Sequence, residues 1–66
     1  MEENFKENLK QLRVANKMSQ KDLANKLDTT VKTVSHWETG YCEPSITQII
    51  QLCHVLDVST DDLLCK

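Results

Sequence analysis

Glycine, proline and long apolar runs are scarce in this sequence. The chain of 66 residues contains one glycine, Gly40, and one proline, Pro44. Because these two residue types are the strongest breakers of regular structure, the breaks that do occur are informative. No apolar run approaches the ~18 residues that a membrane span needs, and the charged start MEENFKENLK does not resemble a signal peptide. The sequence therefore predicts a soluble, cytoplasmic protein.

Cysteine is present, but its spacing excludes the usual structural uses. Cys42, Cys53 and Cys65 are odd in number and widely separated, which fits neither a secreted disulfide framework nor paired metal ligands. Cys53 and His54 are neighbours on a predicted helix, so their side chains point in different directions. We therefore expect reduced thiols, with Cys53 in the core, no metal site and no cofactor.

Catalytic patterns are also missing. The sequence has no Ser/His/Asp or Cys/His arrangement and no phosphate-binding loop. A chain of this length buries only about 60% of the surface that its unfolded form exposes, which leaves little room for a catalytic cleft. We expect a single domain over residues 1–66 that is not an enzyme.

What the sequence does contain is helical periodicity. Phe5, Leu9 and Leu12 are spaced to share one face of a helix over about residues 3–15. Asn16 and Lys17 follow, and asparagine tolerates a left-handed backbone better than most residues. This pattern predicts that the first helix ends in a turn at Asn16.

Further helix starts are marked by hydroxyl residues placed as N-caps. Such a residue accepts a hydrogen bond from the third backbone N–H of the helix, and an acidic or amide residue at that third position can return one. The predicted caps are Ser19 with Asp22, Thr30, Ser45 with Gln48, and Ser59 with Asp62. With the first helix these give a compact, all-α bundle of five helices.

The stretch TVKTVSHWETG, residues 30–40, is an unusual member of this set. Its residues branched at Cβ have low helix propensity, yet Gly40 stands where a left-handed helix cap belongs. On a helical wheel Val34, Trp37 and Glu38 share one side, expected to pack against Leu23, Ala24 and Leu27. The opposite side contains Lys32, Ser35, His36 and Thr39. Because these side chains carry the donors that read base edges and phosphates, this side has the chemistry of a DNA-reading face.

The run SQKDLANKLDTTVKTVSHWETG, with NLKQLRVANK before it and PSITQIIQLCHVLDVSTDDLL after it, resembles the helix-turn-helix domain of the phage-repressor and Cro-like (XRE-type) family. The resemblance covers nearly the whole chain, and WETG is similar to the W-E-x-G signature of that family. The helix-turn-helix itself would span residues 19–39. The resemblance implies a transcriptional regulator whose third helix lies in the major groove of double-stranded DNA.

Site residues follow from the resemblance position by position. The base-facing residues would be Val31, Lys32, Thr33, Ser35 and His36. The DNA-backbone contacts would come from Ser19, Gln20, Thr39 and Tyr41. Arg13 and Glu38 match positions that typically form a structural ion pair between the first and third helices. Two departures are notable: Asp28 stands where a turn glycine is usual, and the loop after Gly40, often basic, reads Tyr41, Cys42, Glu43.

The net charge of −2 is unusual for a DNA-binding domain, but its distribution is uneven. Residues 1–16 are balanced, residues 17–40 carry +1 and residues 41–66 carry −3. We therefore expect modest attraction to phosphate. A homodimer repressing from a palindromic operator is the simplest interpretation, with Val58, Leu63 and Leu64 as candidate dimer contacts. The alternative is a protein-binding module, such as an antitoxin or adaptor, that binds a partner through the acidic C-terminal half.

Overall fold

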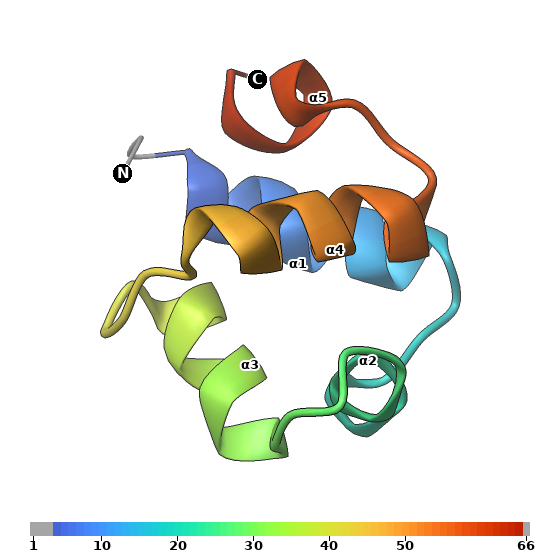
Figure 1. The fold of residues 1–66 in the computed structure, drawn as a ribbon, viewed down its shortest axis with the longest axis vertical. Helices are drawn as coiled ribbons and strands as arrows, with labels where there is room; N and C mark the ends of the chain where they lie inside the picture. The colour runs from blue at the N-terminus through green and yellow to red at the C-terminus, as the bar shows by residue number, and fades with distance from the viewer. Residues whose placement is uncertain (1–3, 66) are drawn as a thin grey trace.

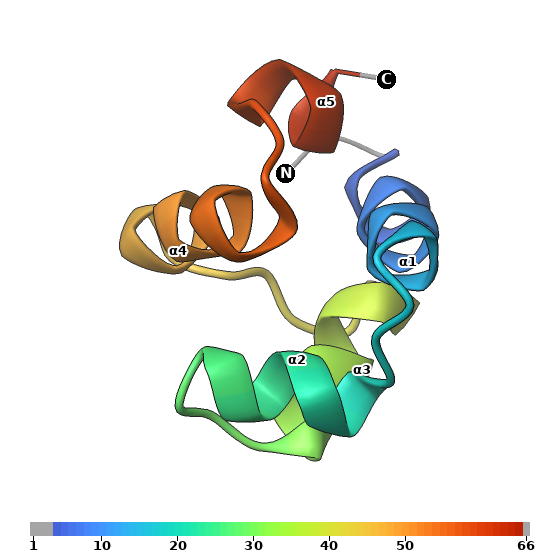
Figure 2. The same cartoon turned by 90° about the vertical axis from the view of Figure 1, so that its right-hand side faces the viewer.

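The computed structural model describes residues 4–65, and every regular element in that range is a helix. The helices are α1 (Phe5–Ala15), α2 (Gln20–Lys26), α3 (Val31–Thr39), α4 (Ile46–Leu56) and α5 (Thr60–Leu64). In Figures 1 and 2, α2 and α3 lie together at one end, α5 lies at the other, and α1 and α4 lie between them. The predicted five-helix all-α fold is confirmed. The predicted start of the first helix at residue 3 lies outside the described residues.

Three helices begin with a complete capping box. Ser19 Oγ accepts from the backbone N–H of Asp22 at 3.0 Å, and Asp22 Oδ2 accepts from the Ser19 N–H at 2.9 Å. The same reciprocal pair joins Ser45 to Gln48 at the start of α4. Ser59 and Asp62 form the third box, at the start of α5. Local sequence therefore fixes these helix starts, because each box gives a hydrogen-bond partner to two backbone N–H groups, that of the cap residue and that of the third helical residue.

The turn after α1 lies at Asn16 and Lys17 as predicted, but its left-handed residue is not Asn16. Lys17, with φ +59°, adopts the left-handed conformation, whereas Asn16 has φ −86°. The Asn16 side chain is instead used for tertiary contacts: Nδ2 donates to the carbonyl of Leu12 at 2.8 Å and to that of Leu56 at 3.3 Å. Asn16 thus joins the end of α1 to the end of α4. The predicted end of the helix is confirmed, and only the left-handed residue differs, because local propensity says nothing about a carbonyl that α4 brings within reach of Asn16.

The core is formed by all five helices. Its fully or nearly buried apolar residues are Phe5, Leu9, Leu23, Ala24, Val34, Trp37, Ile49, Leu52, Leu56 and Leu63. Leu12, Leu27 and Cys53 are half-buried and pack against this cluster. Burial raises the pKa of the Cys53 thiol, which keeps it protonated and unreactive. No helix in the described range is long and apolar enough to cross a membrane.

The candidate dimer residues at the C-terminal end are largely used by the core. Leu63 is fully buried, and Val58 and Leu64 are half-buried against the cluster. Two large exposed apolar side chains lie instead on α4: Ile46 is 78% exposed and Ile50, one turn later, is 50% exposed. The apolar surface of the C-terminal half is therefore on α4, where the sequence alone did not place it.

Candidate nucleic-acid interface

Helix α3 forms despite its low intrinsic propensity because both ends are capped and one side is buried. Thr30 Oγ1 accepts from the backbone N–H of Thr33 at 3.2 Å, and Gly40 closes the helix with φ +83°. Val34 is fully buried and Trp37 is 2% exposed. Burial of two large apolar side chains outweighs the few tenths of a kcal/mol per residue by which β-branched residues disfavour a helix.

The five residues of α3 predicted to face bases differ in exposure. Val31, at the first helical position, is 43% exposed, and Lys32 beside it is also exposed. Thr33, Ser35 and His36 are half-buried. The most accessible of the five are therefore the two at the N-terminal end of the helix.

Two hydroxyl groups of this segment are already hydrogen-bonded within the protein. Thr33 Oγ1 lies 3.0 Å from Thr30 Oγ1, and Thr39 Oγ1 donates to the His36 carbonyl at 3.3 Å. A hydroxyl has one donor and two acceptor positions, so each retains capacity for a further bond. Thr39 is exposed and lies beside the C-terminal cap of α3.

The loop after α3 folds back onto His36. The ring of Tyr41 lies against the His36 imidazole with 4.7 Å between centroids, and Cys42 Sγ lies 4.0 Å from His36 Nδ1. The backbone N–H of Cys42 donates to the His36 carbonyl at 3.2 Å. Tyr41 nevertheless remains 78% exposed. Its side chain is therefore available to an approaching ligand while its ring restricts the orientations open to His36.

Helix α2 presents Ser19 and Gln20 at its N-terminal end, but both side chains have intramolecular partners. The Ser19 hydroxyl is part of the capping box described above. Gln20 Nε2 donates to Glu38 Oε1 at 3.1 Å, which joins α2 to α3. No pattern in the sequence indicated this bond, because residues 18 positions apart meet only through the fold. It still leaves the Gln20 carbonyl and one N–H for other contacts.

Glu38 is the centre of a polar network that joins three helices. Arg13 Nε donates to Glu38 Oε2 at 2.6 Å, and Arg13 Nη2 donates to Oε1 at 3.1 Å. The remaining Arg13 nitrogen, Nη1, donates to the Met18 carbonyl at 2.8 Å. The hydrogen bond to Glu38 raises the pKa of Arg13. The ion pair expected between the first and third helices is thus present, in bidentate form and with additional partners.

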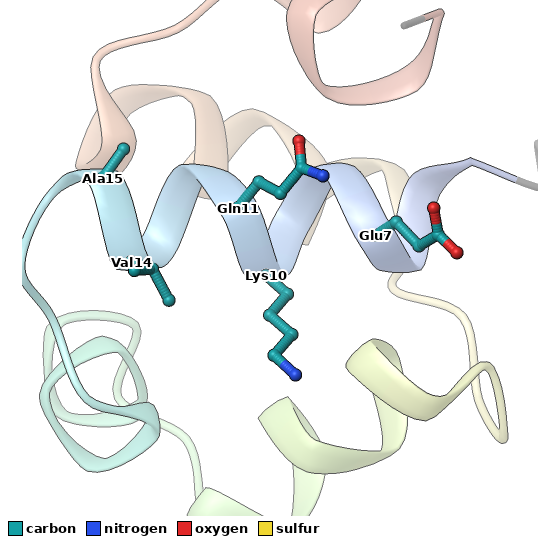
Figure 3. A pocket seen from close by; sticks show the side chains of 5 residues that line it. All are labelled: Glu7, Lys10, Gln11, Val14 and Ala15. Carbon is teal, nitrogen blue, oxygen red and sulfur yellow. The ribbon is translucent and has the colours of Figure 1, made fainter.

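A surface hollow of about 520 Å³ lies along α1 (Figure 3). Its lining comes entirely from exposed residues of that helix: Glu7, Lys10, Gln11, Val14 and Ala15. In Figure 3 the Lys10 side chain extends to the side on which α2 and α3 are drawn. The lining includes no nucleophile paired with a base, and no group of three metal-binding side chains is found in the described part of the chain.

Comparison with known proteins identifies the family to which the chain belongs. The model of the family described as Helix-turn-helix matches residues 9–63. The chain belongs to the helix-turn-helix family. The resemblance to phage-repressor and Cro-like domains drawn from SQKDLANKLDTTVKTVSHWETG is thereby confirmed.

Two regulators, one known by its sequence and one by its structure, are similar to most or all of this chain. The chain is 40% identical over 60 residues to an HTH-type transcriptional regulator, YqaE, of Bacillus subtilis (strain 168), covering 91% of this chain and 52% of that protein. It spans about half the length of this curated relative. Among solved structures, a transcriptional regulator from Listeria innocua matches with a TM-score of 0.87 and 26% identity, over 100% of this chain and 62% of that one.

An enzyme also contains this fold. Hydroxypropylphosphonic acid epoxidase from S. wedmorenis matches with a TM-score of 0.86 and 39% identity, over 92% of this chain but 32% of the epoxidase. The likeness therefore concerns one third of that enzyme. The helix-turn-helix fold occurs both in regulators and as a part of a larger catalytic chain, so the fold alone does not fix the function.

Proposed function

We propose that this chain is a sequence-specific DNA-binding domain of a transcriptional regulator. The observation that carries the proposal is the exposed N-terminal end of α3, where Val31 and Lys32 lie. The opposite side of this helix is packed into the core through Val34 and Trp37. A helix fits the major groove, and residues near the N-terminus of a recognition helix contact base edges. The name of the Bacillus subtilis relative supports the same function.

The roles of the side chains follow from their chemistry. Lys32 donates to guanine acceptors, and Val31 contacts a thymine methyl group. Thr33, Ser35 and His36, half-buried on the same helix, contribute further donors. Ser19 and Gln20 bring the N-terminus of α2, where backbone N–H groups point outward, to a phosphate. Thr39 and Tyr41 contact the backbone on the other side of the groove.

We further infer that the domain acts as a dimer on palindromic DNA and represses by occupying the operator. One such domain reads few base pairs, and symmetric half-sites about 34 Å apart let two recognition helices enter successive major grooves. The Arg13–Glu38 network helps to position α3 for entry into the groove, because it joins α3 to α1 and α2.

The test is selection of bound duplexes from a random DNA pool at two salt concentrations, with the wild type and a double variant. We expect the wild type to enrich a palindrome, and Lys32→Ala with His36→Ala to lose that preference while melting at the same temperature. A matched control is Lys26→Ala with His54→Ala, which removes the same residue types from exposed positions outside α3. Unchanged preference in the first double variant would rule out this recognition face.

A second candidate function, protein binding, is favoured by the exposed pair Ile46 and Ile50. Exposed apolar groups one turn apart on a helix are suited to contact with a partner, including a second copy of the chain. The net charge of −3 over residues 41–66 would favour a basic partner. If the random pool yields no enriched sequence at either salt concentration, this function becomes the better proposal.

A further inference from the structure

The loop that follows the recognition helix contains no cation of its own. Its residues Tyr41, Cys42 and Glu43 include one carboxylate and no lysine or arginine. Under the proposed function this loop lies beside the sugar-phosphate backbone of DNA, where a positive charge supplies much of the binding free energy. The sequence alone therefore suggests that this part of the interface is electrostatically poor.

The fold brings a cation to this loop from α1. Arg13 faces α3, because it is bonded to Glu38. Lys6 lies seven residues earlier, two helical turns away, and so shares the same face of α1. The position that a β-carbon of residue 40 would occupy is 3.3 Å from Lys6 Cδ and 3.7 Å from Lys6 Nζ. The ammonium group of Lys6 therefore lies directly over the glycine that ends the recognition helix.

The exposure and pairing of the Lys6 ammonium group are suited to contact with a ligand. Lys6 is exposed and forms no ion pair with another residue that the structure describes. Its position at the C-terminus of α3 also places a positive charge at the negative end of a helix dipole, which is a purely structural role. The two roles differ in one respect: only a phosphate contact changes the salt dependence of DNA binding.

We propose that Lys6 is a phosphate-binding residue that replaces the missing cations of the loop at residues 41–43. The proposal rests on the proposed function, since it assigns one more contact to the same interface. Glycine at position 40 fits this arrangement, because a β-carbon there would lie 3.3 Å from Lys6 Cδ and the lysine stem would have to shift by a few tenths of an ångström.

The experiment measures affinity for the selected operator between about 50 and 200 mM salt for the wild type, Lys6→Gln, Lys6→Arg and Lys26→Gln. Each phosphate contact contributes about 0.9 to the slope of log affinity against log salt. We expect Lys6→Gln to lower the slope by about that amount, so that its affinity deficit shrinks about 3–4-fold across this range. Lys6→Arg should keep the wild-type slope, and so should Lys26→Gln, which removes the same charge from the C-terminal end of α2.

The outcomes separate this inference from the function on which it rests. A wild type that binds no DNA removes the proposed function itself. Specific binding with an unchanged slope for Lys6→Gln overturns the role of Lys6, and a lowered melting temperature in the same variant would then assign Lys6 to the helix dipole. An equal loss of slope for Lys26→Gln would also overturn it, because the effect would then reflect net charge alone.

Discussion

Arg13 and Glu38 lie 25 positions apart in the sequence, yet the Arg13 guanidinium donates two hydrogen bonds to the Glu38 carboxylate. Their side chains are 11% and 5% exposed, so the pair is almost removed from water. A buried carboxylate needs all its partners, and here Gln20 supplies the remaining one that the structure records. One carboxylate therefore joins α3 to both α1 and α2, in addition to the apolar packing of Val34 and Trp37.

Removal of Arg13 should strongly destabilise the fold. In Arg13→Ala, Glu38 is left buried with only the Gln20 amide, and breaking a buried pair from one side costs about 3–5 kcal/mol. A domain of this size has a total stability of roughly 3–10 kcal/mol, so the variant should be partly unfolded near body temperature. Urea denaturation followed by circular dichroism measures the loss. Lys10→Ala, on the exposed side of α1, is the control, and a similar midpoint for both variants would contradict the importance of the pair.

Two of the left-handed positions, Asp28 and Gly40, should respond to substitution with opposite signs. Asp28 has φ +55°, a conformation that costs a residue with a side chain about 1–2 kcal/mol relative to glycine. Asp28→Gly removes this strain but adds freedom to the unfolded chain, so we expect a gain of up to about 1 kcal/mol. Gly40→Ala introduces such strain and also meets the Lys6 stem at 3.3 Å, so we expect a loss of at least about 1 kcal/mol. Thermal melting of both variants tests the signs, and the same sign for both would be inconsistent with the backbone argument.

Acid should weaken the start of α2 through Asp22. Hydrogen bonds from the backbone N–H and the hydroxyl of Ser19 lower the pKa of Asp22 below its ordinary value. Because the pKa is lower in the folded state, the stabilisation is present above the unfolded pKa of about 4 and is lost as the pH falls through the lowered folded value. Asp22→Asn should therefore lose less stability than the wild type between about pH 6 and pH 3. Asp28→Asn makes the same chemical change at a carboxylate outside any capping box, and it serves as the control.

The three cysteines should divide into two classes toward a thiol-alkylating reagent. Cys42 and Cys65 are exposed, whereas Cys53 is half-buried against the core and burial raises the pKa of its thiol. Because the thiolate is the reacting form, the native protein should rapidly incorporate two labels, with the third appearing only in denaturant. Mass spectrometry of peptides identifies the labelled positions. Rapid labelling of Cys53 in the native state would show that α4 does not pack as described.

Local sequence was sufficient wherever structure depends on neighbours in the chain. The cap residues Ser19, Thr30, Ser45 and Ser59 were each predicted, because a cap joins groups three residues apart. Core residues such as Leu9, Val34 and Trp37 followed from helical periodicity. The left-handed turn at Asp28 was expected from the resemblance, since the family usually has glycine at this position.

The candidate site was predictable to a smaller extent. Exposure of Val31 and Lys32 at the tip of α3 follows from the helical wheel. The bond from Gln20 to Glu38 and the Tyr41 ring against His36 were not foreseen. Such contacts depend on the angle between helices and on the course of a loop, and a wheel drawn for one helix contains neither.

The sequence by itself determined that five helices form, where the second to the fifth begin and which sides are apolar. These properties depend on interactions within a few residues. Only the tertiary structure decided that Asn16 bonds to the end of α4, that Ile46 and Ile50 stay exposed, and that Lys6 lies over Gly40. The physical reason is that the partners of a long polar side chain, and the cover of an apolar one, come from segments distant in the chain. Only packing decides which of these segments lie close enough.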